Sequence, residues 1–300
     1  MTAEESYATA VSLLSVGDIR GVRYMKEAAE LGYPKAQNSY AMILYSGDLL
    51  PKDREQAFRW FRSAAEGGID ESQFHMGLEY YDGELVPRDY REAMKWFRVA
   101  AEKGYPDAQY YLGLCYYHGR GVFRDYGFAL SWFTLASDKG HSPATIALAD
   151  AYMDLNNPER DYKKAYGLYR EASEAGDVRG HYKLGLCYYK GRGAPRNYIE
   201  ASKCFRKGIE QGDDGDCRYM LAMMYIKGEG VQKNHNLGMK MINRAAAEGN
   251  EAARKYLNLI TLKDKAADDD IIMEGSDTPD MIGGVKGVER KGLRSILGRK

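Results

Sequence analysis

Cysteine, histidine and net charge are all scarce in this sequence. Among 300 residues there are four cysteines and five histidines, and 43 basic residues balance 43 acidic ones. No Cys-x-x-Cys pair and no His-Glu-x-x-His spacing occurs, so the sequence predicts no metal site and no cofactor. The balanced charge provides no overall field that would favour nucleic acid or an anionic membrane.

Long apolar runs and an export signal are also missing. No uninterrupted apolar stretch approaches the roughly 20 residues that a membrane-spanning helix needs. The sequence starts MTAEESYATAVSLLSVGD, with acidic residues where a signal peptide would have basic ones. We therefore expect a cytoplasmic protein with reduced cysteines, no membrane span and no nucleic-acid partner.

Motifs that indicate chemistry are few. The Gly-x-Gly at 119–121 has no strand pattern before it and no Gly-Lys-Ser/Thr after it, so we interpret it as a turn. Cys115 and His118 lie three positions apart and could share a helix face around a metal with a third group. We favour a surface pair without that role.

What the sequence has in abundance is tyrosine, with 25 residues, and an internal repeat. The stretches LGLCYYHGRG (112–121) and LGLCYYKGRG (184–193) are nearly identical. A shift of 36 residues aligns small residues at positions 41, 77, 113, 149 and 185, and a separate glycine series at 32, 68, 104, 140 and 176. A repeat of this length is typical of a solenoid or another repeat array.

Each unit has the pattern of two helices joined by a turn. Ala108, Leu112 and Tyr116 are spaced by four residues and therefore share one helix face. The glycine-rich segment GRGVFRDY (119–126) separates this helix from a second one with the same periodicity. Glycine in the middle of a helix costs about 1 kcal/mol relative to alanine. At Gly77, Gly113 and Gly185 we expect the close approach of a neighbouring helix to compensate.

The repeated pattern A-x-x-x-L-G-x-x-Y-x-x-G-x-G-V, followed by A-x-x-W-F-x-x-A-A-E-x-G, resembles the Sel1-like repeat family, a relative of the tetratricopeptide repeats. The best matches are residues 73–104 and 108–140, and the resemblance covers roughly residues 3–262. It implies an all-α, right-handed superhelical solenoid of about seven helix-turn-helix repeats of 36 residues. We expect this domain to span residues 1–262, including a C-terminal capping helix, with a charged, disordered tail at 263–300.

The resemblance favours a non-enzymatic scaffold or adaptor. Some secreted relatives bind or hydrolyse β-lactams, but a serine β-lactamase needs a Ser-x-x-Lys box, and this sequence has none. We predict a monomer that binds an extended segment or helix of another protein. Two alternatives stay open: a hydrolase or small-ligand-binding protein using Asp150, Asp154 and His118, and a signalling regulator whose tail docks on a membrane or another domain.

In the resembled repeats, partners lie along the concave face formed by the first helix of each pair. The corresponding positions here carry an aromatic stripe and charges that change from acidic to basic toward the C-terminus. Tyrosines offer large, rigid contact area, although each of them could instead pack in the core. Core packing is what we expect of Tyr80, Tyr116, Tyr152, Tyr188 and Tyr225. The predicted partner-binding residues are Phe74, Tyr81, Asp82, Tyr110, Tyr117, His118, Asp154, Tyr182, Tyr189, Lys190 and Tyr219.

The tail has two blocks of opposite charge. Residues 264–280 carry seven acidic residues against one lysine, and residues 286–300 carry six basic residues against one glutamate. A solvated tail is the simplest interpretation. The basic block could also form an amphipathic helix on a partner, or the tail could cover the concave face.

Overall fold

The computed structural model describes residues 1–212 and 215–274, with side chains as far as Leu262. These residues form fifteen α-helices and no strand, which confirms the predicted all-α class. The helices are α1 (Ala3–Ser15), α2 (Gly21–Glu30), α3 (Pro34–Ser46), α4 (Arg54–Glu66), α5 (Asp70–Asp82), α6 (Tyr90–Glu102), α7 (Pro106–His118), α8 (Tyr126–Ser137), α9 (Ser142–Met153), α10 (Tyr162–Glu174), α11 (Val178–Lys190), α12 (Tyr198–Glu210), α13 (Asp216–Lys227), α14 (His235–Ala247) and α15 (Glu251–Glu274).

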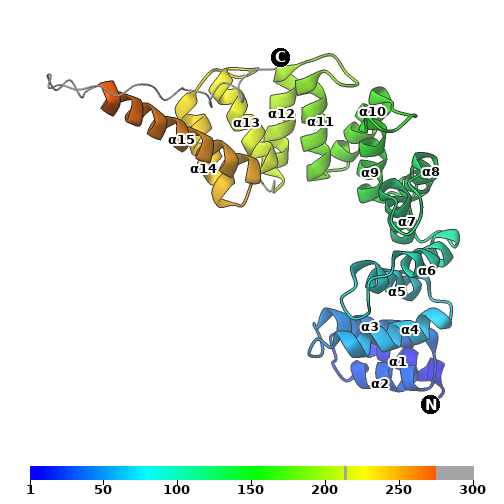
Figure 1. Cartoon of the computed structure of the whole chain (residues 1–300). Coiled ribbons are helices and arrows are strands. Elements are labelled where there is room, and N and C mark those ends of the chain that lie inside the picture. The colour runs from blue at the N-terminus through cyan, green and yellow to red at the C-terminus, as the bar shows by residue number, and fades with distance from the viewer. Residues whose placement is uncertain (213–214, 275–300) are drawn as a thin grey trace, which may run out of the picture.

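The helices pack in sequence order along a curved array, with α1 and α15 at opposite ends of the arc (Figure 1). From α1 to α13, each odd-numbered helix packs against the even-numbered helix that follows it. The odd-numbered helices of neighbouring repeats also approach each other, as α7 does with α9 and α11 with α13. They therefore form the inner, concave side, while α8 and α10 lie outside (Figure 1).

Local sequence explains where each helix begins and ends. Gly119 ends α7 in the left-handed conformation, with φ of 70°, which glycine adopts without steric cost. Asp125 begins α8 by accepting a hydrogen bond from the backbone N–H of Phe128 at 3.0 Å. In the fourth repeat, Asp154 stands where other repeats have the glycine that ends the first helix, and its backbone is extended rather than left-handed. There, buried Asn157 holds the loop through a 2.8 Å hydrogen bond from Nδ2 to the Ala151 carbonyl.

The mid-helix glycines Gly77, Gly113 and Gly185 each lie against an aromatic ring of their own repeat. A Cβ atom on Gly113 would lie 2.6 Å from Phe133, and one on Gly185 would lie 2.5 Å from Phe205. Both rings are fully buried. This confirms the predicted close approach, because only glycine leaves room for the ring.

Glutamine side chains join successive repeats. Buried Gln37, Gln73 and Gln109 each donate a hydrogen bond from Nε2 to a carbonyl near the end of the preceding helix, at 3.3, 3.2 and 3.1 Å. Each of these carbonyls also accepts a backbone hydrogen bond from the glycine that follows its helix, so the glutamine adds a second bond to the same oxygen. The repeats are therefore fixed to one another by polar as well as apolar contacts.

The C-terminal helix is longer than predicted. Helix α15 continues past the expected boundary at 262 to Glu274, so residues 263–274 are helical rather than part of a disordered tail. The physical reason is that a helix already nucleated by packing at Ala253 extends without a new nucleation cost. The rest of the predicted tail, residues 275–300, lies outside the described residues.

The tyrosines expected in the core are half-buried. All five pack against the apolar core clusters of their repeats, and none is fully buried. These residues are Tyr80, Tyr116, Tyr152, Tyr188 and Tyr225.

Candidate functional site

A hollow of about 720 Å³ lies on the concave side, between α7, α9 and α11. Tyr110 and Tyr117 come from α7, Tyr182 comes from α11, and the small side chain of Ala147 on α9 lies among them. Its charged lining consists of Asp150 from α9, Asp154 directly after that helix, Arg179 and Lys183 from α11, and Asp216 at the start of α13. Four successive repeats thus contribute to one amphipathic surface.

The hollow opens at a position where the size of the side chain differs between successive repeats. Positions 75, 111, 147 and 183 are equivalent in successive repeats and carry His, Tyr, Ala and Lys. In the repeat before the hollow, the ring of Tyr81 packs edge-on against that of Tyr111, with centroids 5.4 Å apart. The equivalent partner of Tyr117 is Ala147, whose methyl group fills far less space. An aromatic side chain is therefore absent at the point where the hollow opens.

Asp154 is held by two tyrosines. The hydroxyls of Tyr117 and Tyr126 donate hydrogen bonds to its Oδ2 at 2.8 and 3.0 Å, and the backbone N–H of Asn156 donates to Oδ1 at 2.9 Å. The Asn156 backbone hydrogen bond, with those of the tyrosines, lowers the pKa of Asp154. Burial, together with Asp154, raises the pKa of Tyr117. Asp154 is therefore a carboxylate anion that neutral hydrogen-bond donors hold in place.

Asp150 is held by a tyrosine and a lysine. The Tyr169 hydroxyl donates to Oδ1 of Asp150 at 2.5 Å, and Lys183 Nζ lies 2.7 Å from the same oxygen. Neither interaction uses Oδ2. Tyr169 occupies a position that is Phe97, Phe133 or Phe205 in other repeats, so its hydroxyl is the one polar addition to an otherwise apolar core position.

The basic side of the hollow begins at Arg179. Its Nη2 lies 2.8 Å from Oδ2 of Asp177 at the start of α11. Burial by itself would raise the pKa of Asp177, but hydrogen bonds from Arg179 and Ser142 lower it to about 2. The guanidinium side chain keeps 54% of its surface exposed. It therefore remains accessible to a ligand in the hollow.

The structure brings together five of the predicted partner-binding residues. Tyr110, Tyr117, His118, Asp154 and Tyr182 all line the hollow. Sequence reasoning missed Ala147, Lys183 and Arg179 as lining residues, and it missed Tyr169 as the support of Asp150. The available signals were the small residue at 147 and the tyrosine within a phenylalanine series.

The aromatic stripe is interrupted toward the N-terminus. Phe74 and Tyr81 are each only 8% exposed, because both pack against Tyr111 and Phe97 in the core formed by α5, α6 and α7. Their burial corrects the expectation that they present aromatic surface to the groove. Asp82, on the same helix, is exposed but does not line the hollow.

Three predicted residues lie beyond the hollow toward the C-terminus. Tyr189 donates a hydrogen bond from its hydroxyl to Glu229 at 2.6 Å and accepts one from Lys227 at 3.1 Å. Lys190 is exposed and Tyr219 is half-buried. These residues continue the inner surface without joining the hollow itself.

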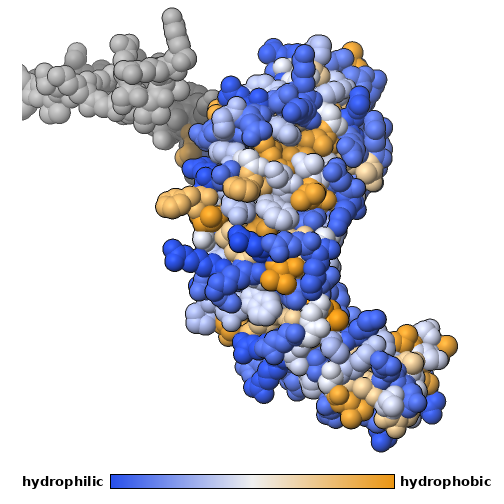
Figure 2. Space-filling view, turned by 90° about the vertical axis from the view of Figure 1, so that its right-hand side faces the viewer, coloured by the Kyte–Doolittle hydropathy of each residue, from blue (hydrophilic) through white to orange (hydrophobic). Residues whose placement is uncertain are grey.

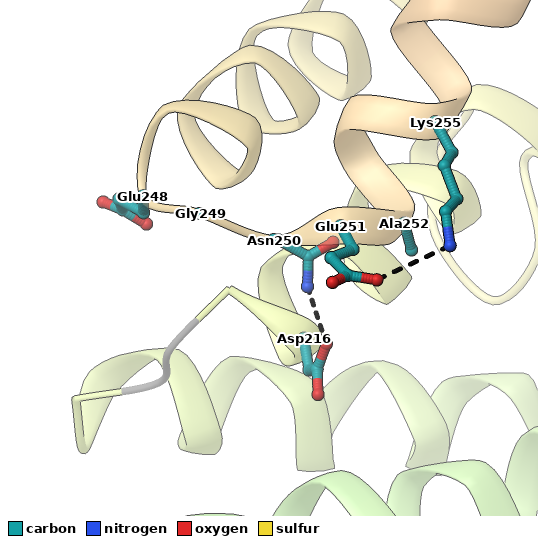
Figure 3. Close-up of a pocket in the computed structure, with 7 residues that line it drawn as sticks. All are labelled: Asp216, Glu248, Gly249, Asn250, Glu251, Ala252 and Lys255. Atoms are coloured by element: carbon teal, nitrogen blue, oxygen red, sulfur yellow. Dashed lines mark hydrogen bonds and ion pairs between the residues drawn. The ribbon is translucent and has the colours of Figure 1, made fainter.

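A second, smaller hollow of about 470 Å³ lies where α13 meets the α14–α15 connection (Figure 3). Its polar side chains pair with one another. Asn250 donates from Nδ2 to Asp216 at 2.6 Å, and Lys255 lies 3.5 Å from Glu251. We interpret it as a joint between repeats.

Other chemistry is sparse in the described part of the chain. No cluster of three or more His, Cys, Asp or Glu residues there could hold a metal ion. All four cysteines are buried, and burial raises the pKa of Cys115 to about 12. Such a thiol is a poor nucleophile near neutral pH. No helix in the same residues is long and apolar enough to cross a membrane.

Comparison with known proteins assigns the repeat. The sequence matches the family model of the Sel1 repeat at residues 17–33, 34–69, 70–105, 106–141, 142–177, 178–213 and 215–250. The chain belongs to the Sel1 repeat family. Proteins of this family generally act as protein–protein interaction scaffolds. The first match begins just before α2, so α1 and α15 flank the matched repeats.

Two solved structures resemble this Sel1 repeat protein closely. One is c5321, a protective antigen of uropathogenic Escherichia coli, with 36% identity and a TM-score of 0.70 over 80% of this chain. The chain spans about half, 51%, of that protein. The other is a Sel1 repeat protein from Oxalobacter formigenes, with 26% identity and a TM-score of 0.72, covering 80% of this chain and 96% of that one. The comparison with curated proteins yields no match.

Proposed function

We propose that this protein is a non-enzymatic scaffold or adaptor that binds a segment of another protein in the concave hollow. The observation that carries the proposal is the convergence of Tyr110, Tyr117 and Tyr182 from neighbouring repeats around one open, charged hollow. Tyrosine is enriched at binding hot spots because it combines large contact area with a polar tip. An extended segment or a helix would bury these rings.

The hollow is preorganised, which favours binding. Tyr117 is fixed by its hydrogen bond to Asp154, and the ring of Tyr110 packs against His141 with centroids 5.2 Å apart. Side chains held in place lose little conformational entropy when a partner binds. Figure 2 shows the side on which α8 and α10 lie, where a largely hydrophilic surface carries separate apolar groups.

The charged groups favour binding over catalysis. A hydrolase using Asp150, Asp154 and His118 would need a general acid or base with a pKa near neutral pH. The pKa of Asp154 is lowered instead, and Asp150 is paired with Lys183. Burial, together with Arg120 and Arg124, lowers the pKa of His118 as well.

We further infer a cytoplasmic monomer. Cys115, Cys187 and Cys204 are buried free thiols, which is typical of a reducing compartment. At the N-terminal end, α1 covers the first matched repeat, and α15 covers the last. Flanking helices of this kind reduce the tendency of repeat arrays to associate end to end.

Affinity capture from the native cell with mass spectrometry tests the proposal. The triple variant Tyr110→Ala/Tyr117→Ala/Tyr182→Ala should lose the proteins captured by the wild type, because a true hot-spot residue contributes about 2 kcal/mol or more. The matched control, Phe128→Ala/Leu135→Ala/Ile199→Ala, removes exposed side chains from outer helices and should retain them. If the folded triple variant keeps the same partners, the hollow is not the binding surface.

A further inference from the structure

The concave hollow has an acidic and a basic side. Asp150, on α9, and Asp154, directly after that helix, form the acidic side, and Arg179 and Lys183 on α11 form the basic side. Asp216, at the start of α13, adds a further carboxylate to the lining. A ligand in the hollow is therefore selected by its charges as well as by the aromatic rings.

The C-terminal sequence of the same chain ends in a block whose charge is opposite to that of Asp150 and Asp154. Residues 286–300 carry six basic residues against one glutamate. Most of the acidic residues that precede this block, from Asp264 to Glu274, belong to helix α15. The basic block is therefore the part of the tail whose charge complements the acidic side of the hollow.

The chain is long enough for this arrangement. The hollow lies about three repeats before α15, and helices pack 8–10 Å apart, which makes the separation about 30 Å. The part of α15 beyond Leu262 adds about 18 Å at 1.5 Å per residue. The 26 residues after Glu274 can span at most about 86 Å when fully extended. If α15 points away from the hollow, the distance from Glu274 is about 48 Å, so the part of the basic block from about residue 289 onward reaches the hollow when the chain is extended.

We propose that residues 286–300 of this chain bind the acidic side of the concave hollow and compete there with the partner segment. This inference rests on the proposed function of the hollow, because it concerns the regulation of that same site. The basic block supplies Lys and Arg side chains for the carboxylates, and Val288, Leu293 and Ile296 supply apolar contacts for the tyrosine rings.

The test uses a fluorescent peptide of residues 284–300 and measures its binding by anisotropy. It compares the wild-type full chain with the full-length variant Lys286→Glu/Arg290→Glu/Lys291→Glu/Arg294→Glu, whose own tail can no longer compete. A tethered segment has an effective concentration of about 1 mM. For a peptide with a Kd of about 100 μM, the wild type should therefore bind about tenfold more weakly than the variant.

Two further variants in that tail-reversed background locate the binding surface. Asp150→Asn/Asp154→Asn keeps the size of both side chains and should abolish most of the peptide binding. The control Asp138→Asn/Glu171→Gln neutralises exposed acids on the outer helices and should leave it unchanged. Raising the salt concentration should weaken binding in the unmodified hollow.

The outcomes separate this inference from the proposed function. Equal peptide affinity for the wild type and the tail-reversed variant overturns the inference. Peptide binding that is unchanged in Asp150→Asn/Asp154→Asn overturns it as well. Binding of the peptide to phosphatidylserine vesicles but not to the protein also overturns it, because the basic block is then a membrane segment. In each of these cases, loss of captured partners from the tyrosine variant would still support the hollow as a binding site.

Discussion

Replacing Gly113 with alanine tests the packing that holds each repeat together. The new Cβ would lie 2.6 Å from both Cδ1 and Cε1 of Phe133, whose ring is fully buried. Relief would require the ring or the helix to move by nearly 1 Å in a close-packed core, which places the cost near the upper end of 1–3 kcal/mol. Alanine regains about 1 kcal/mol of helix propensity. The net loss in the free energy of unfolding should be about 2 kcal/mol.

Chemical denaturation followed by circular dichroism measures this difference. Gly167 provides a matched control, because it also lies within a helix but no neighbouring element comes within 4 Å of the place that an alanine methyl group would take. Gly167→Ala should therefore stabilise the protein by about 1 kcal/mol. Both substitutions add the same methyl group, yet they should change the free energy of unfolding in opposite directions. The packing argument is refuted if Gly113→Ala is as stable as the wild type or more stable.

Three other predictions concern titration and hydrogen bonding. Burial lowers the pKa of His75 below its usual value, so the unfolded chain binds a proton more readily than the folded one below about pH 6.5. The free energy of unfolding should therefore fall from pH 7 to pH 5, and His75→Gln should reduce that fall; identical pH profiles would contradict this. Tyr169→Phe removes the hydrogen bond to Asp150 while keeping the ring, and denaturation should show a loss of about 1.5–3 kcal/mol; an unchanged midpoint would show that the bond contributes nothing. Cys115 should react with a thiol reagent at pH 8 far more slowly in the folded protein than after denaturation; equal rates would contradict its burial.

The sequence predicted the repeat architecture because its signals are local. The small residue at 113 and the ring at 133 belong to the same repeat, and their mutual fit recurs at 185 and 205. Asp125 and Gly119 fix the ends of neighbouring helices through backbone geometry alone. Each of these features depends on a few nearby residues, so one sequence is sufficient to locate it.

The candidate site was harder to predict because it depends on contacts between repeats. Tyr81 and Tyr117 occupy equivalent positions, yet Tyr81 is buried and Tyr117 lines the hollow. The difference lies 30 residues further along, where Tyr111 covers the first and Ala147 leaves the second open. Which equivalent tyrosines are exposed therefore depends on pairs of residues in adjacent repeats.

The most direct test of the account is to fill the hollow without removing any of its contacts. Ala147→Tyr places in the fourth repeat the side chain that Tyr111 provides in the third, and Gly167→Tyr adds the same side chain to the outer helix α10 as a control. The partner identified by capture should bind Ala147→Tyr at least tenfold more weakly than the wild type in calorimetry, with the control unchanged and all three proteins equally folded. Equal affinity for Ala147→Tyr and the wild type would contradict the claim that this hollow binds a protein segment.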